Sequence, residues 1–219
     1  MRISRLLIAV LLAPSVVLAE PLPPPVFPFE SAVPAKKVAY DPIRYLQLGQ
    51  FRVAFEKTTL DEVLRRLGTG KIAHIGDASE SNYWLCYTSN QAQSSYRLWI
   101  SSSGEMGGPQ HSVTHFAAEP IMANAWKSDE CPELPKQFQR ASLDGKIWLN
   151  TSVREVERAL GKPASIESDW RRFYFEKSFM RKSSTVGAPK EEWTVSSWLY
   201  TKGANGRITL LAAGVITSN

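Results

Sequence analysis

Residues 58–68 read TTLDEVLRRLG, and residues 151–161 read TSVREVERALG, at a constant offset of 93 residues. In each stretch, hydroxyl side chains precede apolar residues at helical spacing, and a glycine closes the run. Hydroxyl groups cap the first turn of a helix, and glycine readily adopts the left-handed conformation that ends one. The two stretches therefore predict two related amphipathic helices; two unrelated helices with ordinary caps are the alternative.

The chain after each predicted helix also corresponds. Runs rich in aromatic and β-branched residues, separated by turn-forming clusters, predict antiparallel strands; these runs are residues 71–75, 83–88, 96–101 and 112–118, then 164–168, 172–177, 193–201 and 207–216. We predict an α+β protein of two tandem helix plus antiparallel β-meander units, joined into one curved sheet with the helices on one face. The units span residues 40–118 and 142–219, and residues 119–141 form a polar, proline-containing linker on the surface.

This arrangement resembles the β-lactamase inhibitor protein architecture and the related BamE (SmpA/OmlA) envelope lipoproteins. The residues that carry the resemblance are 59–68 and 152–163, and the likeness extends over about residues 49–216. It implies an exported binding protein, since some such proteins inhibit enzymes through a concave sheet and others assist outer-membrane assembly. The chain lacks the lipidated cysteine of the lipoproteins and has one possible disulfide where the inhibitor is expected to hold one in each copy. Neither specific activity is therefore carried over.

The N-terminus predicts export. Arg2 and Arg5 precede a short apolar run at residues 6–12, and a small-residue pattern predicts cleavage after Ala19, so residues 1–19 form a signal peptide. An uncleaved anchor is the alternative. Residues 20–39 are rich in proline and predict an extended, weakly ordered leader. No later segment is apolar enough to span a bilayer, so we expect no stable membrane insertion and a periplasmic or secreted protein.

The charge balance argues against a nucleic-acid partner. The chain has 26 lysines and arginines against 21 acidic residues, a formal net charge of +5. Loss of the two signal arginines leaves 24 against 21, or +3, and no basic cluster marks a phosphate-binding face.

Cys86 and Cys131 are the two cysteines of the chain. In an exported protein such a pair is expected to form a disulfide, worth about 4 kcal/mol for a loop of this length. Two cysteines so far apart, with no histidine near them, do not form a metal ligand set. We expect no metal site and no cofactor.

Catalytic motifs are not evident. His111 and His115 have the spacing of a helical metal pair, but their segment reads as extended and would separate them by about 13 Å. The chain has no nucleophile elbow, phosphate-binding glycine loop or zinc-protease motif. The remaining enzymatic alternative is a cell-envelope hydrolase that uses loop carboxylates, and its candidates are Asp77, Glu80, Glu167 and Asp169.

Aromatic residues give the strongest functional prediction. Alternation along the strands, with the two copies aligned, predicts a set of rings that points away from the helices: Trp84, Trp99, Phe173, Phe175, Trp198 and Tyr200. Large exposed rings are typical anchors for a protein partner. We predict a non-enzymatic protein that binds another envelope or secreted protein as an inhibitor, immunity factor or assembly accessory. A structural envelope protein, with these rings filling the seam between copies, is a further alternative.

Overall fold

The structure is a computed structural model that describes residues 21–27, 43–77, 80–90, 95–104, 110–121, 130–182 and 189–218. The predicted signal peptide, residue 20 and residues 28–39 of the leader lie outside these ranges. The described elements are mainly strands, arranged as one large and one small antiparallel sheet.

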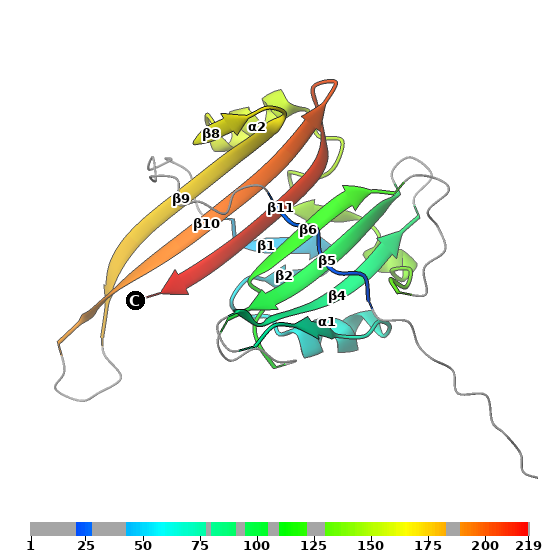
Figure 1. Ribbon diagram of the computed structural model, residues 1–219, viewed down its shortest axis with the longest axis horizontal. Helices are drawn as coiled ribbons and strands as arrows, with labels where there is room; N and C mark the ends of the chain where they lie inside the picture. Colours follow the sequence, from blue (N-terminus) through cyan, green and yellow to red (C-terminus); the bar gives the residue numbers. More distant parts are fainter. Residues whose placement is uncertain are drawn as a thin grey trace, which may run out of the picture.

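Two four-stranded meanders form the large sheet (Figure 1). The first consists of β3 (Ala73–Ile75), β4 (Asn82–Ser89), β5 (Tyr96–Ser103) and β6 (His115–Pro120). The second consists of β8 (Ser165–Glu167), β9 (Trp170–Arg181), β10 (Glu191–Ala204) and β11 (Arg207–Ser218). Strands β6 and β11 pair with each other, with Ala117 opposite Ala212, so the spatial order is β3-β4-β5-β6-β11-β10-β9-β8.

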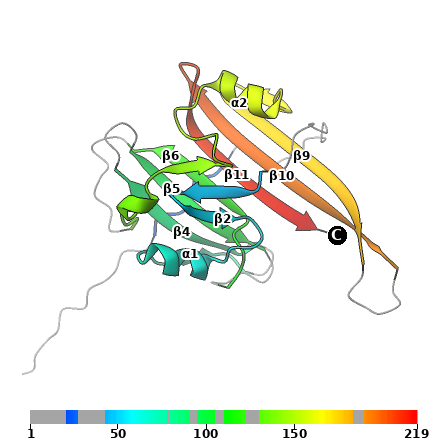
Figure 2. The same cartoon turned by 180° about the vertical axis from the view of Figure 1, so that it is seen from behind.

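The small sheet closes the core from one side. It contains β1 (Tyr45–Leu48), β2 (Phe51–Ala54) and β7 (Ala141–Leu143) in the order β2-β1-β7. Figure 2 shows it in front of the large sheet, beside the helix α1 (Leu60–Leu67). Apolar side chains of both sheets interdigitate in one core, which includes Leu46, Leu48, Val53, Leu85, Leu98, Ile100, Phe116, Leu199 and Leu211. We call the side of the large sheet that faces this core the inner face, and the opposite side the outer face.

The predicted α+β class, with helices covering one face, is wrong. The described chain is mostly β, and its two α-helices, α1 and α2 (Val153–Leu160), have eight residues each. An eight-residue helix is about 12 Å long, whereas eight strands spaced by about 4.8 Å make a sheet about 34 Å wide. Two such helices are too small to cover that sheet, and the small sheet packs on the same inner face.

Each helix begins as its local sequence predicts, and α1 also ends in this way, whereas Gly161 at the end of α2 has φ 83° and ψ −166°, outside the left-handed helical region. The Thr59 hydroxyl accepts a hydrogen bond from the Glu62 N–H, and Gly68 ends α1 with a left-handed φ of 71°. In α2, Ser152 and Glu155 form a reciprocal capping box. The elements follow the same order in both halves, a helix and then four strands, but both meanders belong to one continuous sheet. The domain boundaries at residues 118–119 and 141–142 therefore stay a prediction.

Removing one N-cap should destabilise the protein modestly. Thr59→Ala and Ser152→Ala are each expected to lower the free energy of unfolding by about 1 kcal/mol, because each leaves an N–H of the first helical turn without its acceptor. Urea denaturation measures the effect. Thr59→Ser, which keeps the hydroxyl, is the control and should stay within about 0.5 kcal/mol of the parent protein. Equal losses for Thr59→Ser and Thr59→Ala would contradict the capping role.

Two segments expected to be loosely placed pack tightly instead. In the predicted surface linker, Cys131, Leu134 and Phe138 are buried, and the Leu134 N–H donates to the Thr88 carbonyl at 2.8 Å. In the leader, residues 21–27 lie across the outer face (dark blue in Figure 1). Apolar residues inside these otherwise polar or proline-rich stretches explain the difference: Leu134 and Phe138 are buried in the core, and Leu22 and Phe27 pack, partly buried, against the large sheet.

Candidate functional site

The outer face carries two pairs of aromatic rings with small residues between them. Trp84 on β4 and Trp99 on β5 form one pair, and Trp198 and Tyr200 on β10 form the other. The strands between the pairs, β6 and β11, present small residues to the same face: Ala117, Ala212 and Gly214. We call these seven residues the outer-face site.

Gly214 is what allows Trp198 to lie close to the sheet. A Cβ atom at Gly214 would come within 2.5 Å of Trp198 Cζ2 and 2.9 Å of His115 Cβ. No side chain larger than hydrogen fits there without moving the indole. The small residues thus keep the middle of the outer face low between the two aromatic pairs.

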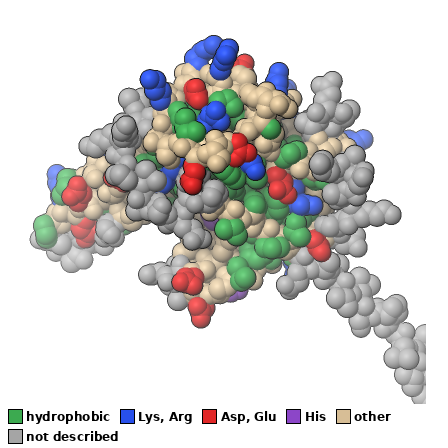
Figure 3. All heavy atoms as spheres, turned by 45° about the horizontal axis from the view of Figure 1, so that its top comes forward, with side chains coloured by type: hydrophobic (Ala, Val, Ile, Leu, Met, Phe, Trp, Pro, Cys, Tyr) green, Lys and Arg blue, Asp and Glu red, His purple; other side chains and the backbone are tan. Residues whose placement is uncertain are grey.

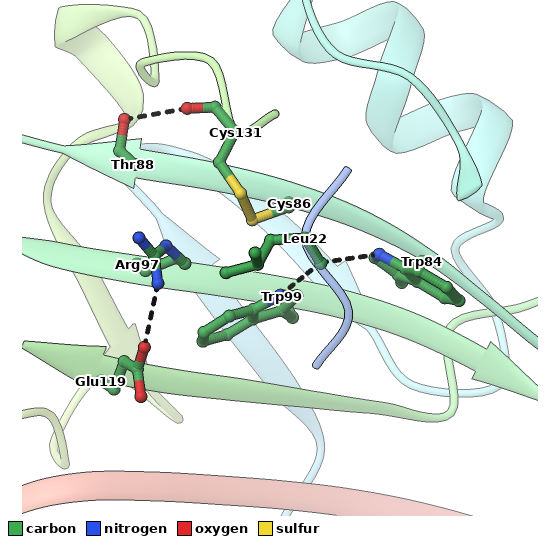
Figure 4. The surroundings of a disulfide bond; sticks show 8 residues. All are labelled: Leu22, Trp84, Cys86, Thr88, Arg97, Trp99, Glu119 and Cys131. Carbon is green, nitrogen blue, oxygen red and sulfur yellow. Dashed lines mark hydrogen bonds and ion pairs between the residues drawn. A yellow bond between two sulfur atoms is a disulfide. The ribbon is translucent and has the colours of Figure 1, made fainter. Parts of the chain in front are cut away.

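Residues 21–27, with the sequence PLPPPVF, occupy the outer-face site, and we call them the leader segment. The indole N–H groups of Trp84 and Trp99 both donate to the Leu22 carbonyl, at 2.9 and 2.8 Å. Figure 4 shows both indoles turned toward this one oxygen. A carbonyl has two acceptor lone pairs, so one peptide group satisfies both buried donors. Trp84 and Trp99 are consequently only 5% and 1% exposed.

At its other end the leader segment contacts the second aromatic pair. The Phe27 ring lies 6.1 Å from the Tyr200 ring and meets the Trp170 ring edge-on at 6.0 Å. Trp198 stacks on Tyr200 at 4.9 Å. The segment therefore runs from the first meander to the second across the strands of both.

Cations lie over the rings at both ends of the site. The Arg97 guanidinium is 5.6 Å from the Trp99 ring and pairs with Glu119 at 3.2 Å. The Arg172 guanidinium lies 5.5 Å from the Tyr200 ring. Burial raises the pKa of the Tyr200 hydroxyl, and the Arg172 charge opposes that rise. Cation–π contacts of this kind hold rings in fixed positions.

Four of the six predicted rings lie on the outer face, and the other two, Phe173 and Phe175, lie on the inner face. Phe173 is fully buried in the main core, and its cross-strand partner Leu199 belongs to the same core. By strand alternation Phe175 shares that inner face, opposite Ser197, whose hydroxyl accepts from the N–H of the core residue Ile43. The alignment of the two copies was off by an odd number of residues along β9, and an odd slip moves every side chain to the other face.

The remaining four rings, Trp84, Trp99, Trp198 and Tyr200, lie on the outer face, but they are not open to solvent. Three of them are buried under the leader segment or against neighbouring rings, and Trp198 is half-buried. Sequence reasoning missed Leu22 and Phe27 as parts of this site. The sequence feature that could have indicated them is the presence of two large apolar residues within a proline-rich stretch.

The predicted disulfide is confirmed. Cys86 on β4 and Cys131 are joined, with their Cα atoms 4.8 Å apart, and both are buried on the outer face beside Trp99 (Figure 4). The Thr88 hydroxyl donates to the Cys131 carbonyl at 3.2 Å, so a hydrogen bond and the disulfide both hold Cys131 against β4. Structural disulfides are typical of proteins of oxidising compartments outside the cytoplasm. In the described part of the chain, no helix is long and apolar enough to cross a bilayer.

His115 lies where the two meanders meet, opposite Gly214 and 6.2 Å from the Trp198 ring. Its Nδ1 is 3.0 Å from the Thr114 hydroxyl. Removal of water from the imidazole lowers the pKa of His115 to about 4. Among the described residues, no three His, Cys, Asp or Glu side chains are grouped as metal ligands.

The neutral His115 should make stability depend on pH. Its pKa in the folded chain lies below the unfolded value of 6.5, so between pH 6.5 and 4 the unfolded state binds a proton that the folded state does not. We expect the free energy of unfolding to fall by about 1–3 kcal/mol more between pH 7 and 4.5 in the parent protein than in His115→Gln. Urea titrations at the two pH values measure this. Identical pH dependence in both proteins would contradict it.

The structure does not bring the predicted carboxylates of the two copies together. Asp77 follows β3 and Asp169 precedes β9, at opposite edges of the large sheet. Paired catalytic carboxylates lie within about 10 Å of each other, and this sheet is about 34 Å wide. Asp169 instead pairs with Lys202 at 3.5 Å, beside a cavity of about 550 Å³ near the start of α2.

Comparison with known proteins gives no family for this chain. No family model matches it, and no curated protein or solved structure is significantly similar to it. The resemblance to the β-lactamase inhibitor protein and BamE groups therefore stays a prediction.

Proposed function

We propose that this chain is an exported, non-enzymatic protein that binds another envelope or secreted protein with the outer face of its large sheet. Its role would be that of an inhibitor, an immunity factor or an assembly accessory. One observation carries the proposal: the outer-face site already holds an extended polypeptide segment by two indole hydrogen bonds and a set of ring contacts.

The composition of the face supports a protein ligand. Trp, Tyr and Arg are the residue types that dominate binding energy at protein interfaces, and this face combines all three. Hydrophobic side chains gather on the side of the molecule shown in Figure 3, with basic and acidic side chains around them. An apolar centre with a charged rim is the usual anatomy of an interface.

Site-specific photo-crosslinking in cells that export the protein tests the proposal. A photoreactive residue at Lys202, on the outer face beside Trp170, should give a discrete adduct with another protein. The matched control at the exposed Arg65 of α1, on the inner side of the fold, should give none. Trp198→Ala should reduce the Lys202 adduct by more than tenfold, since an aromatic anchor contributes about 2 kcal/mol, or about thirtyfold in affinity. No adduct at Lys202, or equal adducts at both positions, would contradict the proposal.

A further inference from the structure

We infer that the outer-face site recognises extended proline-rich segments, and that the leader segment is a built-in competitor that must leave before a partner's segment can bind. The inference rests on the proposed function, because it names the class of partner for the same face. The partner is a polypeptide segment with several prolines between two large apolar residues, the chemistry of PLPPPVF itself.

The contacts match the way proteins recognise polyproline-type helices. Proline fixes φ near −65° and disfavours helical conformation in the residue before it, so a PLPPP run is extended before it binds. Such segments have few N–H groups and offer their carbonyls as acceptors, and aromatic-lined grooves bind them. Here two tryptophans donate to the Leu22 carbonyl, while rings and small side chains contact the apolar groups.

The dimensions agree with this mode. From Leu22 to Phe27 a polyproline helix rises about 16 Å, at about 3.1 Å per residue. The two tryptophans lie on β4 and β5, and Phe27 contacts rings on β9 and β10. These two places are about four strand spacings apart across the sheet, or about 19 Å. Side chains of this size bridge the difference of about 3 Å. Replacement of the proline run by a helix, with a rise of about 1.5 Å per residue, would leave one end unbound.

The leader segment is held in a way that permits exchange. It belongs to neither sheet, so its release breaks no strand ladder of the described fold. One side of it is solvent-facing, with Val26 86% exposed. Residues 28–42 connect it to the small sheet, and a tether of fifteen residues gives an effective concentration on the order of 1 mM. If the leader segment binds the site with a dissociation constant of about 10–100 µM, its presence at that effective concentration weakens a competing segment by about ten- to a hundredfold.

Fluorescence anisotropy with a labelled peptide of residues 20–28, EPLPPPVFP, tests the inference. A variant that lacks residues 21–27 should bind the peptide about ten- to a hundredfold more tightly than the full chain, and Trp99→Phe in that variant should weaken binding several-fold. A peptide with alanine in place of Pro23, Pro24 and Pro25 should also bind several-fold more weakly. Phe27→Ala in the full chain is a second route to a released segment and should give an intermediate gain, whereas Val26→Ala should leave binding unchanged.

The outcomes are decisive in both directions. A folded deletion variant, checked by near-ultraviolet circular dichroism, that binds no better than the full chain would overturn the inference. If the deletion variant does not fold, absence of any gain for Phe27→Ala would overturn it equally. If the peptide does not bind but the Lys202 adduct still forms, the inference fails and the proposed function stands. If the peptide does not bind and no Lys202 adduct forms, both the inference and the proposed function fail.

Discussion

Replacing Trp99 with alanine is expected to lower the free energy of unfolding by about 3–5 kcal/mol. The indole is 1% exposed, packs with Trp84 and the disulfide, and donates to the Leu22 carbonyl at 2.8 Å. Truncation leaves a cavity under the leader segment and removes one of the two donors that hold it. Urea denaturation of the chain from residue 20 onward measures the loss.

Two matched variants separate the ring from its N–H group. Trp99→Phe keeps most of the packing and loses the hydrogen bond, so a smaller loss of about 1–2 kcal/mol is expected. Val26→Ala, on the exposed side of the leader segment, should change stability by less than about 0.5 kcal/mol. A loss below about 1 kcal/mol for Trp99→Ala would show that the indole is not part of a packed layer.

Removing the disulfide should have a comparable effect. The double variant Cys86→Ala/Cys131→Ala is expected to lose about 4 kcal/mol, because the bond closes a loop with a sequence separation of 45 residues. The disulfide joins β4 to the segment that contains Leu134 and Phe138, which both belong to the single core. The unfolding temperature should therefore fall, and the number of unfolding transitions should stay the same.

Reductant supplies the control for this second prediction. Dithiothreitol should lower the unfolding temperature of the parent protein toward that of the double variant and leave the double variant unaffected. An equal response of both proteins to reductant would contradict a disulfide between these cysteines.

The helix caps could be predicted from the sequence because their chemistry is local. Thr59 and Ser152 act on N–H groups three residues away, and Gly68 acts on its own backbone angle. The disulfide could also be predicted from the sequence, since the chain has two cysteines and one possible pairing. The sequence also predicted that the two meanders join into one sheet, but not that β6 and β11 are the strands that pair.

The remaining features depend on distant contacts. Leu22 is hydrogen-bonded to Trp84, 62 residues away in the sequence, and to Trp99, 77 residues away, and no local sequence pattern predicts such contacts. The faces of Phe173 and Phe175 depend on a register set by pairing with β10, which an alignment of diverged copies does not fix. The small sheet was missed as a separate layer because its strands have only three or four residues each.

The leader segment changes how the outer face is interpreted. Taken alone, four large rings on one face indicate a free surface for binding a partner. With residues 21–27 in place, the same rings form a site that already holds a proline-containing segment of this chain. The structural alternative, rings that only fill a seam, predicts a leader segment that never leaves.

Hydrogen exchange at the two indole N–H groups, followed by nuclear magnetic resonance, tests most directly whether the leader segment occupies the outer face. In the intact chain the Trp84 and Trp99 indole protons should exchange slowly, and deletion of residues 21–27 should speed both by at least tenfold while α1 and the inner core keep their protection. Fast exchange of both protons in the intact chain, or no change on deletion, would contradict the account.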